Sequence, residues 1–190
     1  MYELTMPISI LPYLQKFFPH LPLEHWAVMG VIVLALVLYL SIWKKTTVFG
    51  AIALGLTVLV GLFLLDAMVL RRIGVQIEQH PEFDIVAEYR RLFHSDEEHR
   101  VQMLFNVAVF IPFGLCLSAF LSAAKHCKGW RNVGRVALAA FLFSLCIESL
   151  QWILRVGIFE ITDIILNTIG ALLGAAFSLG VISMIKSNDR

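Results

Sequence analysis

Residues 148–174 read ESLQWILRVGIFEITDIILNTIGALLG, and they set charged and amide side chains into a sequence that is otherwise apolar enough for a lipid bilayer. A charged side chain at the centre of a bilayer costs about 3 kcal/mol on insertion scales. Such a residue is therefore kept where it faces a protein interior, pairs with another group or carries a function. The candidates in this stretch are Glu148, Gln151, Arg155, Asp163 and Asn167.

The spacing of these residues predicts two helical stripes. Glu148, Gln151 and Arg155 follow one another at intervals of three and four residues, which places them on one face of an α-helix. Few residues separate this helix from the next, so we expect a tight antiparallel hairpin whose polar faces meet near its turn. Glycines four residues apart allow two helix backbones to come close. The second stripe consists of Asp163, Asn167, Gly170 and Gly174.

The composition of the chain is that of an integral membrane protein. Of its 190 residues, 59% are hydrophobic and 15% are charged, and the mean hydropathy is +0.81. The formal net charge of +1 says nothing about nucleic acid, but no basic block is concentrated enough to follow a phosphate backbone, so no nucleic-acid partner is expected. The three cysteines (Cys116, Cys127 and Cys146) have no metal-ligand or redox spacing, so we expect neither a disulfide nor a metal site. No cofactor is expected.

Five apolar runs are long enough to cross a bilayer, for which about 20 helical residues suffice. We therefore predict an all-α integral membrane protein, a five-span transmembrane helix bundle with a short interfacial segment between spans two and three. The expected segments are a proline-rich part at 1–22, spans one and two within 23–70, a polar loop at 71–100, a core of three spans at 101–185, and a tail at 186–190.

The orientation follows from the rule that short cytoplasmic loops are rich in lysine and arginine. Lys44, Lys45, the basic loop 125–135 and the tail are assigned to the cytoplasm, which puts the N-terminus outside and the C-terminus inside. The longer loop 71–100 contains acids as well as bases and is assigned to the outside. Because consecutive spans alternate in direction, the start of span three, the end of span four and the start of span five share one leaflet.

Span three adds three features to the polar stripes. Asn106 lies near its start, in the same leaflet as the other polar residues. Pro112, within the phrase FIPFG at 110–114, lacks a backbone N–H and is expected to kink or break the helix. Gly114 is expected to permit a close helix contact. At the end of span two, Asp66 is expected to reach the interface or to pair with the arginines that follow it.

Two interpretations of the polar residues remain open. In the structural one, Arg155 pairs with Asp163 and the amides of Gln151 and Asn167 bond across helices, at about 0.6 kcal/mol for each bond. In the functional one, the residues converge on a pocket that opens toward loop 71–100. The guanidinium of Arg155 would then meet a phosphate or a carboxylate, for which its planar fork is suited. His94 and His99 do not have a metal-ligand spacing, so no metal site is predicted there.

The order of these motifs resembles a known family. An asparagine precedes the FIPFG phrase, an E-x-x-Q pair follows in the next span, and a TDI-x-x-N-T-x-G phrase opens the last. The residues are Asn106 with 110–114, Glu148 with Gln151, and Thr162, Asp163, Ile164, Asn167, Thr168 and Gly170. Over roughly residues 85–178 this set resembles the VanZ-like family of bacterial membrane proteins, whose founding member is linked to glycopeptide resistance, chiefly toward teicoplanin. The resemblance implies a cell-envelope role in the plasma membrane, with the motif residues facing outward.

The favoured function is the binding of an amphipathic, lipid-linked molecule, with no established reaction. The partner would be a membrane lipid, a lipid-linked cell-wall precursor or a lipoglycopeptide. The alternative is an intramembrane hydrolase or transferase in which Glu148 and Asp163 are the catalytic candidates, as general acid or base. A third interpretation is a structural subunit of an envelope complex whose protein partners are unknown. The binding candidates are Asn106, Glu148, Gln151, Arg155, Asp163 and Asn167, and the structural candidates are Pro112, Gly114, Gly170 and Gly174.

Overall fold

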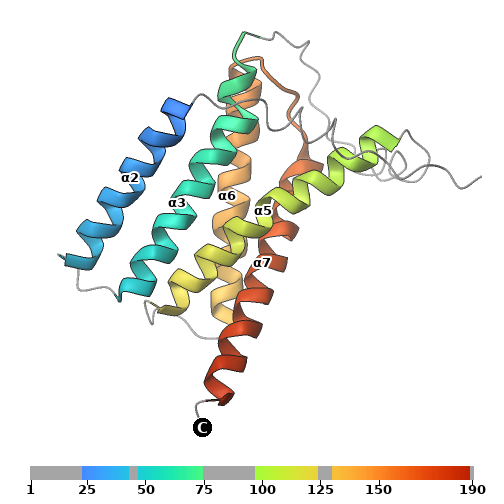
Figure 1. Ribbon diagram of the computed structural model, residues 1–190. Helices are drawn as coiled ribbons and strands as arrows, with labels where there is room; N and C mark the ends of the chain where they lie inside the picture. Colours follow the sequence, from blue (N-terminus) through green and yellow to red (C-terminus); the bar gives the residue numbers. More distant parts are fainter. Residues whose placement is uncertain (1–22, 43–46, 75–96, 124–129, 189–190) are drawn as a thin grey trace, which may run out of the picture.

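The computed structural model describes residues 23–42, 47–74, 97–123 and 130–188, most of which lie in helices (Figure 1). The elements are α2 (Leu23–Ile42), α3 (Val48–Met68), the 3-10 turn η1 (Leu70–Arg72), α5 (Glu97–Ala123), α6 (Trp130–Ile153) and α7 (Ile161–Asn188). The predicted all-helical membrane bundle is confirmed. The proline-rich segment 1–22, the interfacial segment, most of the loop 71–100, Lys44, Lys45, Cys127 and His94 lie outside the described residues.

Four of the described helices are long and apolar enough to cross a membrane, and α2 is a fifth, shorter apolar helix of 20 residues. A helix of that length extends for about 30 Å. Successive helices alternate in direction (Figure 1). As a result η1, the end of α6 and the start of α7 lie together at one end of the bundle, which we call the η1 end. The spanning segments are Val48–Arg72, Arg100–Ala123, Arg131–Ile153 and Ile161–Ile185.

The closest helix contact in the bundle is the crossing of α5 and α7, where backbone meets backbone. A Cβ atom added to Gly170 would collide with the carbonyl oxygen of Val107, and one added to Gly174 would collide with that of Ile111. From the other side, a Cβ on Gly114 would collide with the carbonyl oxygen of Ala171. In lipid, helices associate through close packing and polar contacts rather than through the hydrophobic effect, so the missing side chains are what permit this crossing.

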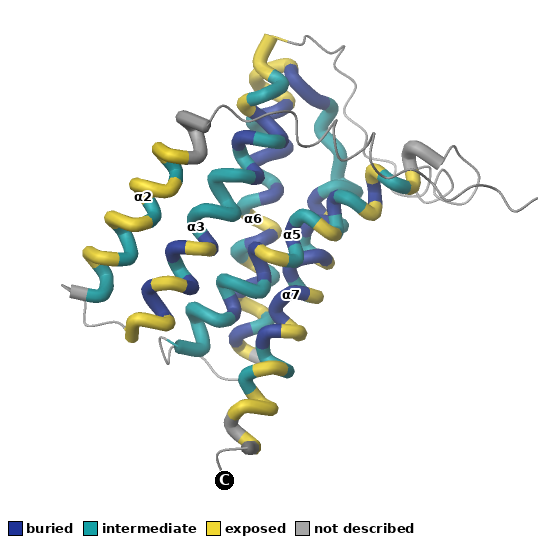
Figure 2. The backbone as a smooth tube through the Cα atoms, in the orientation of Figure 1, coloured by how far each residue is buried: buried dark blue, intermediate teal, exposed yellow. Residues whose placement is uncertain are grey.

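A cluster of three aromatic side chains lies between α5 and α6. Phe110 and Phe113 on α5 have ring centroids 6.0 Å apart, and Phe143 on α6 stacks on Phe113 with its centroid at 5.3 Å. These separations are the usual ones for favourable aromatic pairs. Figure 2 shows that buried residues lie on the facing sides of α3, α5, α6 and α7, whereas exposed residues lie on their outer sides.

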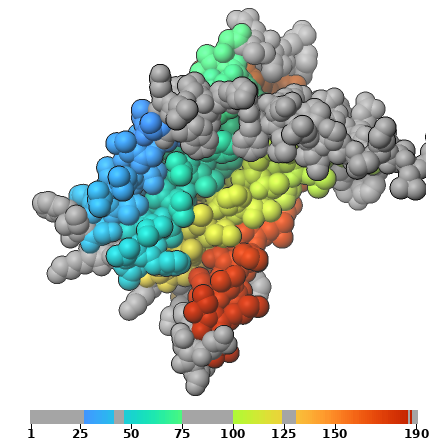
Figure 3. Space-filling model, in the orientation of Figure 1, coloured from blue at the N-terminus to red at the C-terminus, as the bar shows by residue number. Residues whose placement is uncertain are grey.

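The outer surface of the bundle is apolar, as a lipid-facing surface must be. Leu138, Leu173 and Phe177 are among its large exposed side chains. On the face seen in Figure 3, α2 and α3 form one continuous surface with α5 beside them. The α2–α3 contact depends on another glycine, because a Cβ on Gly55 would lie 2.5 Å from Cγ2 of Val37.

Two local features refine what the sequence predicts. Of the kink or break expected at Pro112, a break is excluded, because α5 is continuous from Glu97 to Ala123. A proline removes one backbone donor, and the remaining turns of this long helix keep theirs. The fourth span ends at Ile153 rather than at about Arg155, since the chain turns out of the helix there.

Candidate functional site

A cluster of buried polar side chains lies at the η1 end. Glu148 is 1% exposed and Asn167 is fully buried, and both lie between α6 and α7. Asn106 on α5 and Gln151 on α6 are also buried. Polar groups at such depth must be hydrogen-bonded, or the structure carries the cost of leaving them unpaired. The hydrogen bonds within the cluster therefore decide which of its polar groups are satisfied.

The first connection joins α5 to α7. The Nδ2 atom of Asn106 donates a hydrogen bond of 2.6 Å to Oδ1 of Asp163. Asp163 lies in the first turn of α7, where the helix dipole stabilises a negative charge. Its side chain is half-buried, so it lies between the buried cluster and the end of the bundle. The structure thus brings together two candidates that are 57 residues apart in the chain.

Glu148 has one bonded and one unbonded carboxyl oxygen. Its Oε2 accepts a hydrogen bond of 3.2 Å from the backbone N–H of Glu160, just before α7 begins. Its Oε1 is buried and has no hydrogen-bond partner. The charges that act on this carboxyl group include the acids Asp163 and Glu160 and the base Arg72. Glu148 therefore faces two acids and one base.

Asn167, which lies one helical turn from Glu148 along the interface, also has one bonded and one unbonded polar atom. Its Nδ2 donates a hydrogen bond of 2.8 Å to Oγ of Ser144, while its Oδ1 is buried without a partner. Ser144 lies four residues before Glu148 on α6, so Asn167 and Glu148 are neighbours along the same helix interface. A buried acceptor left unpaired costs about 1 to 3 kcal/mol. Two unpaired acceptors at one interface suit a ligand or a proton that supplies donors.

Gln151 serves a structural purpose. Its Nε2 donates a hydrogen bond of 2.9 Å to the carbonyl oxygen of Met68, which fastens the end of α3 to α6. Its side chain also packs against Gly157, where an added Cβ would lie 3.1 Å from Cβ of Gln151. The sequence suggested that the amide of Gln151 bonds across helices. It does so, but its partner is a backbone carbonyl, which no sequence pattern identifies.

Arg155 does not join the cluster. Its side chain is exposed, and no ion pair links it to Asp163 among the described residues. Its φ of 55° places it in the left-handed region. The N–H groups of Val156 and Arg155 bond to the carbonyls of Gln151 and Trp152, at 2.9 and 3.2 Å, which is the Schellman pattern that ends a helix. The helical stripe that we expected to carry Arg155 inward therefore ends two residues earlier.

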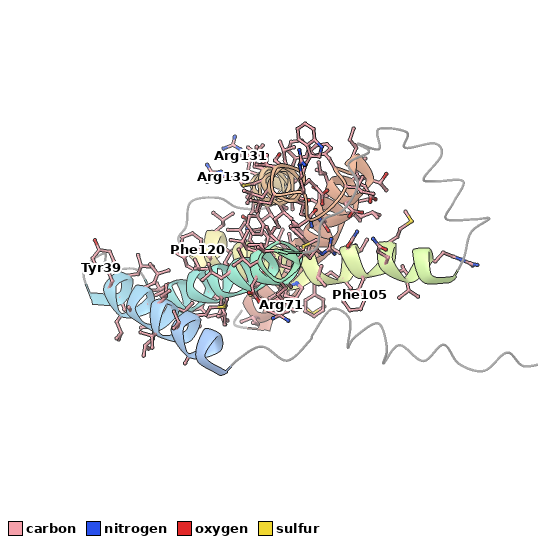
Figure 4. All side chains as sticks on the ribbon, turned by 90° about the horizontal axis from the view of Figure 1, so that it is seen from above. Tyr39, Arg71, Phe105, Phe120, Arg131 and Arg135 are labelled. Carbon is pink, nitrogen blue, oxygen red and sulfur yellow. The ribbon has the colours of Figure 1, made fainter. Side chains whose placement is uncertain are left out.

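A second polar cluster lies at the opposite end of the bundle and was not predicted. Asn132 at the start of α6 is fully buried, and its Nδ2 lies 2.9 Å from Oγ of Ser122 and 3.1 Å from the carbonyl oxygen of Ser118. Its neighbours Arg131 and Arg135 point away from the bundle (Figure 4). A polar residue in an apolar run could have indicated this buried position. Asn132 was not singled out because, in the sequence, it belongs to the basic loop 125–135.

A further polar contact at the η1 end is an ion pair. The Nε atom of Arg71 lies 2.7 Å from Oδ2 of Asp66, which is one of the two arrangements expected for this aspartate. Ser144 and Glu160, the hydrogen-bond partners of Asn167 and Glu148, were not predicted. Ser144 is on the same stripe as Glu148 and could have been found by extending that stripe by one turn. The described residues contain no group of three or more His, Cys, Asp or Glu that could hold a metal ion.

The fold and the buried cluster define a class, a helical multi-pass membrane protein with polar groups enclosed at one end. A family model described as VanZ/LLP1 matches residues 31–183. The chain belongs to the VanZ/LLP1 family, which confirms the resemblance seen in its motifs. Protein VanZ of Enterococcus faecium is 37% identical over 75 residues, or 38% of this chain and 41% of that protein. The match thus spans less than half of that relative. No solved structure matches the chain.

Proposed function

We propose that this protein acts in the cell envelope from the bacterial plasma membrane, and that its buried cluster binds the head group of an amphipathic, lipid-linked molecule. The observation that carries the proposal is the pair of unpaired acceptors, Oε1 of Glu148 and Oδ1 of Asn167, at one helix interface. A purely structural lock would be expected to satisfy its own polar groups; Asn132 at the other end of the bundle leaves a single acceptor unpaired, whereas here two are unpaired at one interface. Glu148 and Asn167 lie about 8 and 9 Å along their helices from the η1 end, within reach of a lipid head group that enters from the interface.

The role of Arg155 changes in this proposal. Because its side chain is exposed beside the exposed Trp152, it contacts the membrane interface instead of the interior of the cluster. An arginine at the interface meets lipid phosphate, while the tryptophan ring lies among the head groups. Arg155 would hold the phosphate of the ligand, and the buried acceptors would bind the remainder of its head group.

The orientation belongs to the same proposal. The η1 end faces outward and the end with Arg131 and Arg135 faces the cytoplasm. Both arginines are exposed in the first two turns of α6, next to a short connection, where positive charge has its strongest influence on topology. At the η1 end, the charge of Arg71 is balanced by Asp66. An outward cluster is open to lipid-linked cell-wall precursors and to lipoglycopeptides.

Expression in a teicoplanin-sensitive Gram-positive host tests this function. Protein VanZ is the named relative, and we expect this chain to raise the inhibitory concentration of teicoplanin more than that of a glycopeptide without an acyl chain. The variants Asn106→Ala and Glu148→Gln should remove the effect, while Asn132→Ala, at the other end of the bundle, should keep it. Equal membrane levels of each variant are checked by immunoblot. Retention of the effect in Glu148→Gln and in Asn106→Ala would refute a role for the cluster.

The enzymatic alternative has one observation in its favour, which is that Glu148 holds a buried, unpaired carboxyl oxygen next to Asp163. Such a group is suited to general acid or base catalysis. Of the two threonines nearest the cluster, Thr168 donates its hydroxyl to the carbonyl of Ile164 at 2.7 Å, which engages that potential nucleophile. Turnover of a radiolabelled lipid-linked precursor by the purified protein, lost in Glu148→Gln, would favour the enzyme over the binding protein.

A further inference from the structure

We infer that the head group held by this cluster carries a protonated primary amine, bound through its N–H donors by Oε1 of Glu148 and Oδ1 of Asn167. The inference rests on the proposed function and names the chemical class of its ligand. Both atoms are hydrogen-bond acceptors, both are buried, and both lack a partner. A primary ammonium group has three donors on one compact charge, so it can bond to two acceptors on neighbouring helices at once.

The charges around the cluster favour a cation. The carboxyl group of Glu148 faces the acids Asp163 and Glu160, with Arg72 as the base that acts on it. Arg155, the cation that could have neutralised the cluster, lies outside it and is exposed. A phosphate or carboxylate placed among these acids would be repelled, whereas an ammonium group would be attracted.

The hydrogen bonds already made in the cluster hold the two acceptors in place. Glu148 is held through Oε2 by the N–H of Glu160, at 3.2 Å, which leaves Oε1 available. Asn167 is held through Nδ2 by Ser144, at 2.8 Å, which leaves Oδ1 available. In each side chain one polar atom fixes the orientation and the other remains open. Acceptors that are positioned in advance lose little entropy when a donor binds.

The residues between the buried atoms and the η1 end lie at the start of α7. Glu160, Thr162 and Asp163 are half-buried, and Asn167 is one helical turn deeper than Asp163. A lipid whose phosphate stays at the interface near Arg155 could extend a short amine past this half-buried rim toward Glu148. The distance along the helix from Asp163 to Asn167 is about 6 Å. That length suits an ethanolamine-sized group.

The test compares lipids that differ in one property at a time. The purified full-length protein is placed in nanodiscs of phosphatidylglycerol doped with phosphatidylethanolamine, or with phosphatidylcholine of the same acyl chains. Phosphatidylcholine has the same charges but no N–H donor. Lipid retained after detergent extraction is counted by native mass spectrometry. We expect about tenfold preference for phosphatidylethanolamine, which corresponds to about 1.4 kcal/mol. Added phosphoethanolamine without acyl chains should compete if the amine alone suffices.

Variants separate the possible outcomes. Glu148→Gln should reduce the preference for phosphatidylethanolamine to less than about threefold. If Glu148→Gln does not fold, Asn167→Leu should give the same reduction. The control Asn132→Ala should keep the preference. Equal retention of the two lipids by the wild type overturns the amine inference. If retention of both lipids still falls in Glu148→Gln, the proposed function stands without the amine. If retention never depends on Glu148 or Asn167, both proposals fail, and a bound proton explains the two acceptors.

Discussion

Asn106 on α5 donates a 2.6 Å hydrogen bond to Asp163 in the first turn of α7. The bond joins the start of one span to the start of another, near the buried Glu148. It therefore fixes the first turn of α7 relative to α5. Because one partner is a carboxylate, this bond should be stronger than an ordinary bond between helices.

A double-mutant cycle measures that bond. The single variants Asn106→Ala and Asp163→Ala and their combination should show a coupling energy of about 1.5 kcal/mol, near the upper limit for hydrogen bonds between membrane helices. The measurement is the free energy of unfolding in mixed micelles with increasing dodecyl sulfate. A coupling energy near zero would show that the two side chains do not stabilise one another in a membrane environment.

The glycines of the α5–α7 crossing provide a matched pair of variants. Gly170→Ala would put a methyl group into the carbonyl of Val107, so we expect the free energy of unfolding to fall by about 1 to 3 kcal/mol. Gly180→Ala lies on the same helix, with nothing within 4 Å of the added Cβ. This control should be neutral, or more stable by about 0.5 to 1 kcal/mol, because alanine favours helix. Similar losses in both variants would contradict the crossing.

The backbone of Arg155 predicts a stabilising substitution. A residue with a Cβ pays about 1 to 2 kcal/mol in the left-handed region, and glycine avoids most of this. Arg155→Gly should therefore raise the midpoint of thermal unfolding, whereas Arg155→Ala, which keeps the Cβ and removes the guanidinium, should not. If both variants raise it equally, the charge rather than the backbone is responsible.

A substitution at Glu148 should raise the stability of the protein while it removes binding. Glu148→Gln replaces a buried ionisable group, which has one unpaired oxygen and two acids near it, by an uncharged amide, so we expect the free energy of unfolding to rise by about 1 kcal/mol even though binding is lost. The unfolding assay in mixed micelles measures this, and Asp66→Asn is the control. Asp66 forms an ion pair with Arg71, so the same change there should destabilise the protein. A loss of stability in Glu148→Gln would mean that its carboxylate is already satisfied.

The orientation of the bundle in the membrane can be measured with a cysteine at position 155. In a Cys127→Ser background, Arg155→Cys gives an exposed thiol at the η1 end, whereas Arg131→Cys gives one at the opposite end. A membrane-impermeant maleimide added to intact cells should label the first and not the second. The reverse labelling pattern would place the cluster in the cytoplasmic leaflet and exclude external ligands.

The helical membrane bundle follows from the sequence because long apolar runs leave few alternatives in lipid. The convergence of Asn106, Glu148, Asp163 and Asn167 also follows, since helical spacing and alternating directions restrict where they lie. What could not be predicted depends on backbone geometry. Arg155 continues the stripe in the sequence, but the helix ends before reaching it, and no glycine marks that end. The partners of Gln151 and Glu148 are backbone groups, and these carry no signature in a sequence.

The glycine crossing also limits how the bundle can move. If α7 slid by one turn along α5, Leu166 would take the position of Gly170, or Ser178 that of Gly174, and the side chain would meet a backbone carbonyl of α5. The glycines therefore fix the register of the two helices, which together form a frame. Any widening that admits a ligand must come from α6 and the end of α3 moving away from this frame.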